Sequence, residues 1–485
     1  MAKLPGGNIW LGIVAAFAAC SGDDGAPADD DTTGTSGINV TTGMETDPSL
    51  DDSSGGDTSG NDSGPIGCQN SELGCSNQLD LLFVIDNSGS MGEEQLNLAR
   101  NLPGLVTALE QLQDSNGMMI NPDVNIMVTT TDSGNVLCDP FYSPGRSAEN
   151  GAPITTPCTD RLDRFTSISP PVVNEEQACT DVCPNPIGPP GNYINFSPSG
   201  TNVPDAPPAD VNGDGTDDSN VAQALACIGP PGIDGCGYES PLESMMQALD
   251  PDAAWNSGDD PFLRPGGLLA VAIITDEADC SVVDESIMSD ESVMEMNPET
   301  MNAVPSSAIC WNAGVSCTGP DGQGEYECSS TGTALRPVQE YIDFLNGQGR
   351  PTVMLGILGI PPVTARNPDP PFEPTAGGVL DLVYRDWQDP DFANGGDILP
   401  DDWDQGRDAA YKTWQFGIGP GCTGEDGNGG FTGQAIPPVR VKEVCEALNT
   451  ADEVRCCMES VCDTDFSGAL QCLTGLVAEN VPPVG

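Results

Sequence analysis

Four short apolar runs divide the chain, and each of them predicts a buried strand. They span residues 81–85, 124–131, 268–275 and 352–358. Unbroken apolar runs with β-branched members are typical of strands that are covered on both faces of a sheet. Because segments with helical spacing separate them, the pattern predicts an α/β fold. The expected core is a doubly wound, mostly parallel sheet flanked by helices.

The helices are expected between and after these strands. Residues 93–113 carry leucines at helical spacing, and Pro103 is expected to kink or split that helix. Ser240, followed by Pro241 and three residues later by Glu243, forms a capping-box pattern that predicts a helix beginning at Pro241. Further helices are predicted at 222–228, 338–345, 439–448 and 466–477, with a short segment at 454–461.

Polar residues stand where the predicted strands end. Asp86 follows the first strand, with Ser88 and Ser90 in the turn behind it, and Asp276 follows the strand 268–275. The carboxyl ends of parallel strands meet at one edge of the sheet, where such sheets bind ligands. Carboxylate and hydroxyl oxygens suit Mg²⁺ or Ca²⁺. Asp132 ends the strand 124–131 at the same edge, either as an outer carboxylate or, as we favour, as a turn cap.

The pattern Asp86-x-Ser88-x-Ser90, directly after a buried strand and before Met91 and Gly92, resembles a known metal site. It is similar to the metal-ion-dependent adhesion site of von Willebrand factor A-type domains, the family that includes integrin I domains. The alternative without a metal is a polar strand-to-helix turn in which a serine caps the helix. The resemblance extends over about residues 78–479 and implies a vWA-like domain.

The same resemblance implies a set of ligands for a divalent cation, which would be Mg²⁺, Ca²⁺ or Mn²⁺. Asp86, Ser88 and Ser90 would bind it directly or through water, and Asp276 would face it from the neighbouring strand. Members of the family usually present a Thr at the start of the next helix. Glu239 and Ser240 stand nearest to that place here, and the resemblance leaves both open.

Three Cys-rich and loop-rich regions, at about 133–220, 280–330 and 361–435, exceed ordinary connections and are predicted to be insertions into one domain of residues 67–480. The first contains half of an EF-hand-like calcium loop at 210–218. The oxygens that would bind Ca²⁺ belong to Asp210, Asn212, Asp214, Thr216 and Asp218. The twelfth position is Val221 instead of a bidentate Glu, so an unliganded polar turn is an equal alternative.

The amino-terminal residues predict export. Residues 1–20 resemble a lipoprotein-type signal peptide, with Lys3, an apolar stretch at 9–19 and small residues before Cys20. This predicts a lipid on Cys20; plain secretion after cleavage near Ala19 is the alternative. Residues 21–66 lack large apolar side chains, and we expect them to form an acidic, disordered tether.

Composition narrows the function further. The net charge of −59, from 74 acidic and 15 basic residues, argues against nucleic-acid partners and leaves the lipid anchor as the only expected contact with a membrane. The absence of His excludes Ser-His-Asp and Cys-His catalysis. Nineteen Cys indicate an oxidising compartment. Without Cys20 they could form nine disulfides, one of them between Cys68 and Cys75, and adjacent Cys456 and Cys457 are expected to pair with different partners.

These features predict a cell-envelope protein that is not an enzyme. The expected function is that of a metal-ion-dependent binding or adhesion module on a lipid anchor. Its ligand would be a protein or glycan that donates an oxygen to the cation. Two alternatives stay open. One is a passive surface or scaffold protein with a structural metal. The other is a metal-assisted hydrolase in which Glu replaces His as the proton carrier.

Overall fold

A seven-stranded sheet forms the centre of the molecule, with strand order β16-β10-β5-β1-β2-β3-β4. The computed structural model describes residues 77–114, 117–140, 142, 146–167, 173–332, 334–425 and 430–481. The predicted signal peptide, the acidic tether, and the residues Cys20, Cys68 and Cys75 lie outside the described residues.

Five parallel strands make up most of this sheet. They are β1 (Gln78–Ile85), β2 (Asp123–Thr130), β5 (Leu268–Ile274), β10 (Thr352–Leu358) and β16 (Cys456–Ser460). All four apolar runs are thus confirmed as strands. Ile85 of β1 lies level with Thr130 of β2 and Ile274 of β5, so the three strands end at one edge. We call it the carboxyl edge.

Two further strands extend the sheet: the first runs antiparallel to β2, and the second runs antiparallel to the first. They are β3 (Ile194–Ser197) and β4 (Gly200–Thr201), and both come from the region predicted to be the first insertion. The sheet is therefore mostly, but not entirely, parallel. Part of that region belongs to the central sheet and is not a surface loop.

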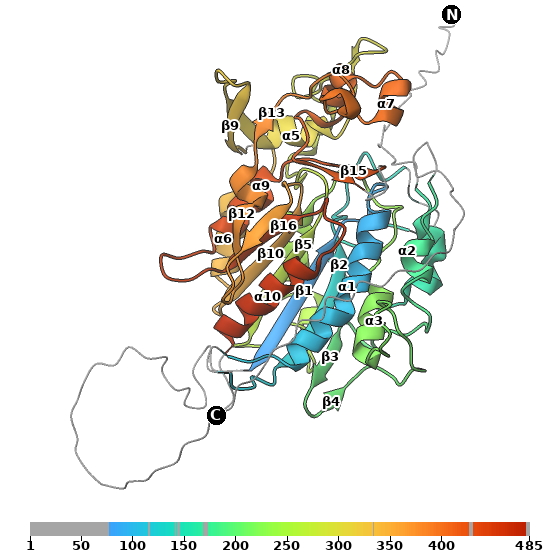
Figure 1. The fold of residues 1–485 in the computed structure, drawn as a ribbon, viewed down its shortest axis with the longest axis vertical. Coiled ribbons are helices and arrows are strands. Elements are labelled where there is room, and N and C mark those ends of the chain that lie inside the picture. The colour runs from blue at the N-terminus through green and yellow to red at the C-terminus, as the bar shows by residue number, and fades with distance from the viewer. Residues whose placement is uncertain are drawn as a thin grey trace, which may run out of the picture.

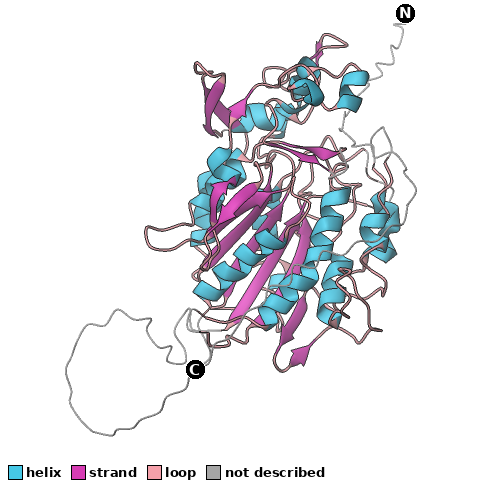
Figure 2. Ribbon diagram, viewed as in Figure 1, coloured by secondary structure: helices cyan, strands magenta, loops and turns pink. Residues whose placement is uncertain are grey.

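Helices cover both faces of the sheet (Figures 1 and 2). Along β1, Leu81, Phe83 and Ile85 join one apolar cluster, whereas Leu82 and Val84 join the other. The first cluster is completed by α1 (Gly92–Glu110), α3 (Asn220–Ile228) and α10 (Ser467–Asn480). The second is completed by α4 (Pro241–Ala248), α6 (Val338–Asn346) and α9 (Val439–Glu446). The predicted α/β class is confirmed.

The helix α1 corrects one prediction, because it runs through Pro103 without being split. Pro103 is buried, as are Leu98, Leu102 and Leu105 on the same helix. A proline inside a helix costs about 3 kcal/mol. Since the apolar face of α1 joins the cluster formed with β1, α3 and α10, tertiary packing offsets this local penalty.

The second and third predicted insertions join into one substructure, the cap, which lies above the carboxyl edge in Figure 1. Strand β13 (Tyr384–Arg385) pairs with β9 (Glu325–Ser330), which pairs with β8 (Val315–Thr318). Trp311, Trp387 and Phe416 share the apolar cluster of the cap. Its helices are α5 (Ala308–Gly314), α7 (Pro400–Asp404) and α8 (Ala409–Phe416).

Short elements fill the remaining connections. Two hairpins are β11 (Val363–Arg366) with β12 (Pro374–Gly377), and β14 (Cys422–Glu425) with β15 (Phe431–Ala435). A third pairs β6 (Met296–Asn297) with β7 (Asn302–Ala303). The other short helices are Cys158–Phe165, α2 (Gln177–Thr180), Ala254–Asn256, Glu285–Ser289, Gly378–Asp381 and Phe392–Asn394.

All sixteen described Cys residues form disulfides, which indicates an oxidising extracellular environment and is consistent with export. Cys456 pairs with Cys445 and Cys457 with Cys472, as expected for adjacent cysteines. The other pairs are 138–236, 158–179, 183–227, 280–310, 317–328 and 422–462. Among the described residues, no helix has the length and apolar character needed to cross a membrane.

Candidate metal site

The turn between β1 and α1 gathers three oxygen-bearing side chains at the carboxyl edge. The N–H of Ser88 donates to Asp86 Oδ1 at 2.8 Å, and the hydroxyl oxygens of Ser88 and Ser90 lie 3.2 Å apart. The side chain of Gln95 donates from Nε2 to the carbonyl of Asp86 at 2.9 Å and so ties the turn to α1. Asp86 and Ser88 are fully buried, whereas Ser90 is half-buried.

Asp276 joins this group from the end of β5, as the strand order predicts. Thr275, just before it, donates from Oγ1 to Asp86 Oδ2 at 2.5 Å. Asp276 itself is hydrogen-bonded to Ser90. Its Oδ1 atom is buried without a hydrogen-bond partner. The turn and the neighbouring strand therefore place Asp86, Ser90 and Asp276 around one position.

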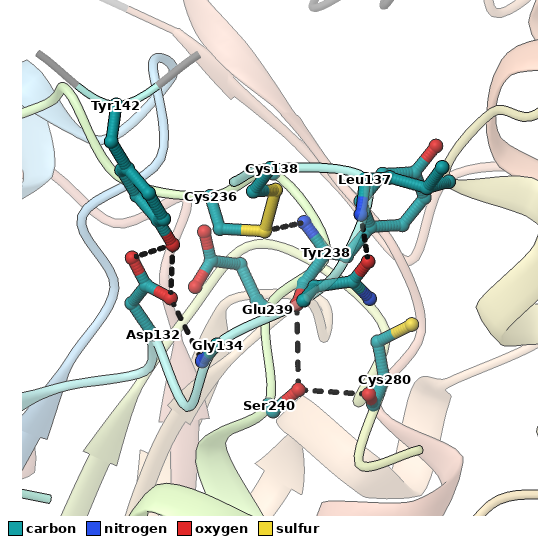
Figure 3. The surroundings of a disulfide bond; sticks show 12 residues. Asp132, Gly134, Leu137, Cys138, Tyr142, Cys236, Tyr238, Glu239, Ser240 and Cys280 are labelled. Carbon is teal, nitrogen blue, oxygen red and sulfur yellow. Dashed lines mark hydrogen bonds between the residues drawn. A yellow bond between two sulfur atoms is a disulfide. The ribbon is translucent and has the colours of Figure 1, made fainter. Parts of the chain in front are cut away.

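Glu239, and not Ser240, directs its side chain toward this position. Glu239 is fully buried, accepts a hydrogen bond from the hydroxyl of Thr131, and keeps its Oε1 atom without a partner. Ser240 Oγ instead donates to the carbonyl of Cys280 at 2.8 Å (Figure 3). Of the two side chains that the sequence left open, Glu239 is the one that places a carboxylate beside Asp86, and its role as a metal ligand stays a prediction.

The capping box predicted at Ser240 is wrong. Ser240 precedes α4, but its side chain accepts no hydrogen bond from the helix. The free N–H groups in the first turn of α4 donate instead to side chains of the loop that follows β5. Leu242 donates to Asp279 Oδ1 at 3.2 Å and Glu243 donates to Ser281 Oγ at 3.0 Å. The Ser240 hydroxyl is oriented by the bond that it donates to the carbonyl of Cys280.

Two carboxylates beside the site were missed by the sequence reasoning. Glu94 lies in the first turn of α1, and its Oε2 atom is buried without a partner. Glu277 is buried directly after Asp276 and is hydrogen-bonded to Ser307 at the start of α5. The available signals were the position of Glu94 just behind the serine turn and the adjacency of Glu277 to Asp276.

Burial and mutual repulsion make this cluster costly to ionise. Burial raises the pKa of Asp86 to about 6, and burial together with the charge of Asp86 raises the pKa of Asp276 to about 7. The pKa values of Glu94, Glu239 and Glu277 are raised well above normal, first by burial and then by neighbouring carboxylates. In the described part of the chain, no Lys or Arg forms an ion pair with any of these side chains.

The donor set fits a hard divalent cation. Buried carboxylate oxygens without partners, on Glu94, Glu239 and Asp276, are the atoms that a cation would satisfy. Across the described residues, no group of three or more His, Cys, Asp or Glu side chains is arranged as a ready-made metal cage. The hydroxyl oxygens of Ser88 and Ser90 would therefore have to share in the coordination, as the resemblance implies.

Asp132 proves to be a turn cap, which was the favoured alternative. Its carboxylate accepts from Tyr142 Oη at 2.8 and 2.7 Å and from the N–H of Gly134 at 3.1 Å (Figure 3). These donors take up both oxygens, so Asp132 contributes charge to the surroundings of Glu239 without being directed at the cation position.

The second candidate site, at 210–218, is an exposed turn. Hydrogen bonds from its own backbone N–H groups to its aspartate side chains hold it together. Asp210 accepts from the N–H groups of Gly213, Asp214 and Gly215 at 2.7–3.1 Å. Asp218 accepts from the N–H of Val211 at 2.7 Å. The turn therefore holds its shape through these bonds. Calcium at Asp210, Asn212, Asp214, Thr216 and Asp218 stays a prediction.

No protein-family model matches the sequence, and no curated protein is significantly similar to it. What the site does has therefore to be inferred from its own residues and their geometry.

Proposed function

We propose that this protein is an exported, metal-ion-dependent binding module with a vWA-like fold. The observation that carries the proposal is the meeting of Asp86, Ser88, Ser90, Glu239 and Asp276 at the carboxyl edge of the sheet. These residues would hold Mg²⁺, Ca²⁺ or Mn²⁺. The resemblance of the serine turn to the adhesion site, and the position of Asp276 on the neighbouring strand, support this assignment.

The bound cation would supply an electrophilic position for an oxygen of the ligand. Asp86, Ser88 and Glu239 are buried, whereas Ser90 and Asp276 are partly exposed. The ligand would therefore approach over Ser90 and Asp276. We infer a protein or glycan ligand and no catalytic step. A lipid on Cys20 would attach the module to the cell envelope, and detergent partitioning of the wild type against Cys20→Ala tests that part.

Calorimetric titration with Mg²⁺, Ca²⁺ and Mn²⁺ tests the metal site. We expect the wild type to bind, and Asp86→Asn to lose binding at this site. Asn keeps an acceptor for the N–H of Ser88, so the turn should survive. Asp259→Ala, which removes the same charge from an exposed loop, serves as the matched control and should bind like the wild type. A wild type that binds no cation, or an Asp86→Asn variant that binds normally, would refute the proposal.

A further inference from the structure

Glu239 occupies an energetically unfavourable place in a segment without regular structure. The segment between α3 and α4 forms neither helix nor strand. It brings the Glu239 carboxylate out of water and beside the carboxylates of Asp86, Asp132 and Glu277. Both desolvation and like-charge repulsion favour an alternative in which this side chain turns outward. The segment must therefore be held in place by other contacts.

Backbone hydrogen bonds hold the segment along its length, among them one at Ile233 and three at Gly235, Glu239 and Ser240. The N–H of Gly235 donates to the carbonyl of Asn87 at 2.8 Å, and the N–H of Ser240 donates to Thr131 at 2.9 Å. The carbonyl of Glu239 accepts from the N–H of Cys280 at 2.6 Å. Gly235 lies so close to the Asn87 side chain that a Cβ atom would clash with it. These contacts fix the path of the chain but are individually weak and reversible.

A disulfide bond at Cys236, three residues before Glu239, also holds the segment in place. Cys236 is bonded to Cys138, which lies in the turn that follows β2 (Figure 3). Both cysteines are buried, and the N–H of Tyr238 donates to the sulfur of Cys236 at 3.5 Å. The N–H of Cys138 donates to the carbonyl of Asn135 at 2.8 Å. The disulfide therefore joins the Glu239 segment to a turn that is anchored at the carboxyl edge.

We propose that the Cys138–Cys236 disulfide positions Glu239 for the cation, so that the metal site is complete only after this disulfide has formed. The inference rests on the proposed function, because it concerns the affinity of that same site. Its physical basis is preorganisation: the covalent bond limits how far the segment can move, and thereby resists the repulsion that would expel Glu239. Cation binding is then linked to oxidation of the chain after export.

The test compares two pairs of substitutions. Cys138→Ser/Cys236→Ser removes the disulfide in question. Cys317→Ser/Cys328→Ser removes the disulfide between β8 and β9 in the cap and is the matched control. Cation titrations should show at least a tenfold loss of affinity in the first variant and less than a twofold change in the second. Far-UV circular dichroism should show the same fold content in both. Wild-type affinity in the first variant would overturn the inference.

A double-mutant cycle separates positioning from a general structural role. Glu239→Gln should weaken cation binding in the wild type but have little further effect once Cys138–Cys236 is absent, because both changes remove the same interaction. Fully additive effects would overturn the inference. If the wild type binds no cation, the proposed function fails first. If Glu239→Gln weakens binding but loss of the disulfide does not, only the positioning role fails.

A second variant covers the case in which serine prevents folding. Cys138→Ala/Cys236→Ala places a small apolar side chain at these buried positions and is tested in the same titrations. Failure of both pairs to fold, with the cap control intact, would overturn the inference. The disulfide would then be needed by the whole domain instead of the site.

Discussion

Glu239 lies beside Asp86, and as a metal ligand in place of the threonine that the family resemblance implies it would change the charge of the candidate site. With a divalent cation bound, the ionised carboxylates of Asp86, Glu239 and Asp276 would carry a formal −3, so the sum is −3 + 2 = −1 before the nearby Glu94 and Glu277 are counted. Two unit charges about 4 Å apart interact by about 4 kcal/mol at an effective dielectric constant near 20. We therefore expect a carboxylate from a partner to be disfavoured. A hydroxyl or amide oxygen from a sugar or peptide would suit the proposed site better.

We predict that Glu239→Thr weakens the binding of the cation and improves the binding of carboxylate-bearing ligands. Metal affinity should fall by about tenfold or more, because the charge of the ligand set tunes the affinity of such sites. Calorimetric titration and ligand capture measure the two effects. Glu299→Thr, at an exposed position of the cap, is the control. An unchanged metal affinity in Glu239→Thr would show that Glu239 does not coordinate the cation.

The sequence predicted the residues of the site where a strand end fixes their direction. Asp86 and Asp276 each end an apolar run, so their proximity follows from parallel pairing. The choice between Glu239 and Ser240 did not follow, because it depends on which side chain the irregular segment turns inward. The carbonyl of Cys280 decides that choice by engaging Ser240. The place of Glu94 beside the site did not follow either, because spacing in the sequence does not show in which direction its side chain points.

At the scale of elements, α4 begins where it does because a distant loop caps it. Asp279 accepts from the N–H of Leu242, and it also pairs with Arg440 of α9 at 2.8 Å. The side chains of Asp279 and Arg440 are almost completely buried, with exposures of 0% and 2%. The loop behind β5 therefore holds together the helix beside Glu239 and a helix on the same face of the sheet.

We predict that Asp279→Ala lowers the free energy of unfolding by about 3–5 kcal/mol, because removing one partner leaves a buried charge unpaired. Glu446→Ala breaks a second ion pair on the same helix, with Lys442, but there the carboxylate is 41% exposed. An exposed pair of this spacing contributes only about 0.3–0.5 kcal/mol. Urea denaturation of the two variants gives the comparison. Equal effects would contradict the role assigned to Asp279.

Helices and strands that are rich in apolar residues were the easiest to predict from the sequence. The strands β1, β2, β5 and β10 contain the four apolar runs, and their predicted bounds differ from the observed ones by at most three residues. The strands β3 and β4 were missed, because INFS at 194–197 alternates over only four residues inside a Pro- and Gly-rich region. Pro103 was misjudged, because local propensity does not include the packing of α1 on the sheet.

At the scale of the whole molecule, the acidic site links stability to pH and to the cation. The folded pKa values of Asp86 and Asp276, about 6 and about 7, lie above the usual value near 3.9 for an unfolded chain. The folded state thus binds these protons more tightly than the unfolded state. The resulting stability is fully present below about pH 4 and is lost as the pH rises toward 7.

We predict that, in a chelator, the contribution of these two groups to stability is larger at pH 5 than at pH 7.5. A divalent cation should reverse this, because it binds the ionised site of the folded protein. Calorimetric melting at both pH values, with chelator and with Mg²⁺, measures the change. Comparison with Asp86→Asn/Asp276→Asn isolates the site from other carboxylates. The idea fails if the double variant keeps the same dependence on pH and cation.

The cap could not be predicted as one substructure. Composition marked 280–330 as a Cys-rich insertion and 361–435 as a separate loop-rich one, and nothing in their spacing pairs β9 with β13. Their union depends on an aromatic cluster around Trp311 and Trp387, whose members come from both regions. The burial of Trp387 and Trp414 shows that much of the third region packs upon itself. Trp403 is 38% exposed.

The order of the first six described cysteines has a consequence for how the chain matures. Cys138 pairs with Cys236, 98 residues away, and this bond encloses the pairs Cys158–Cys179 and Cys183–Cys227. If each cysteine were oxidised with the next one to arrive in an oxidising compartment, all three bonds would be wrong. Cys138 must wait, or be released from an early partner by thiol–disulfide exchange. We expect that, where an early non-native partner forms, disulfide reshuffling limits the rate at which the native bonds appear and an isomerase accelerates it.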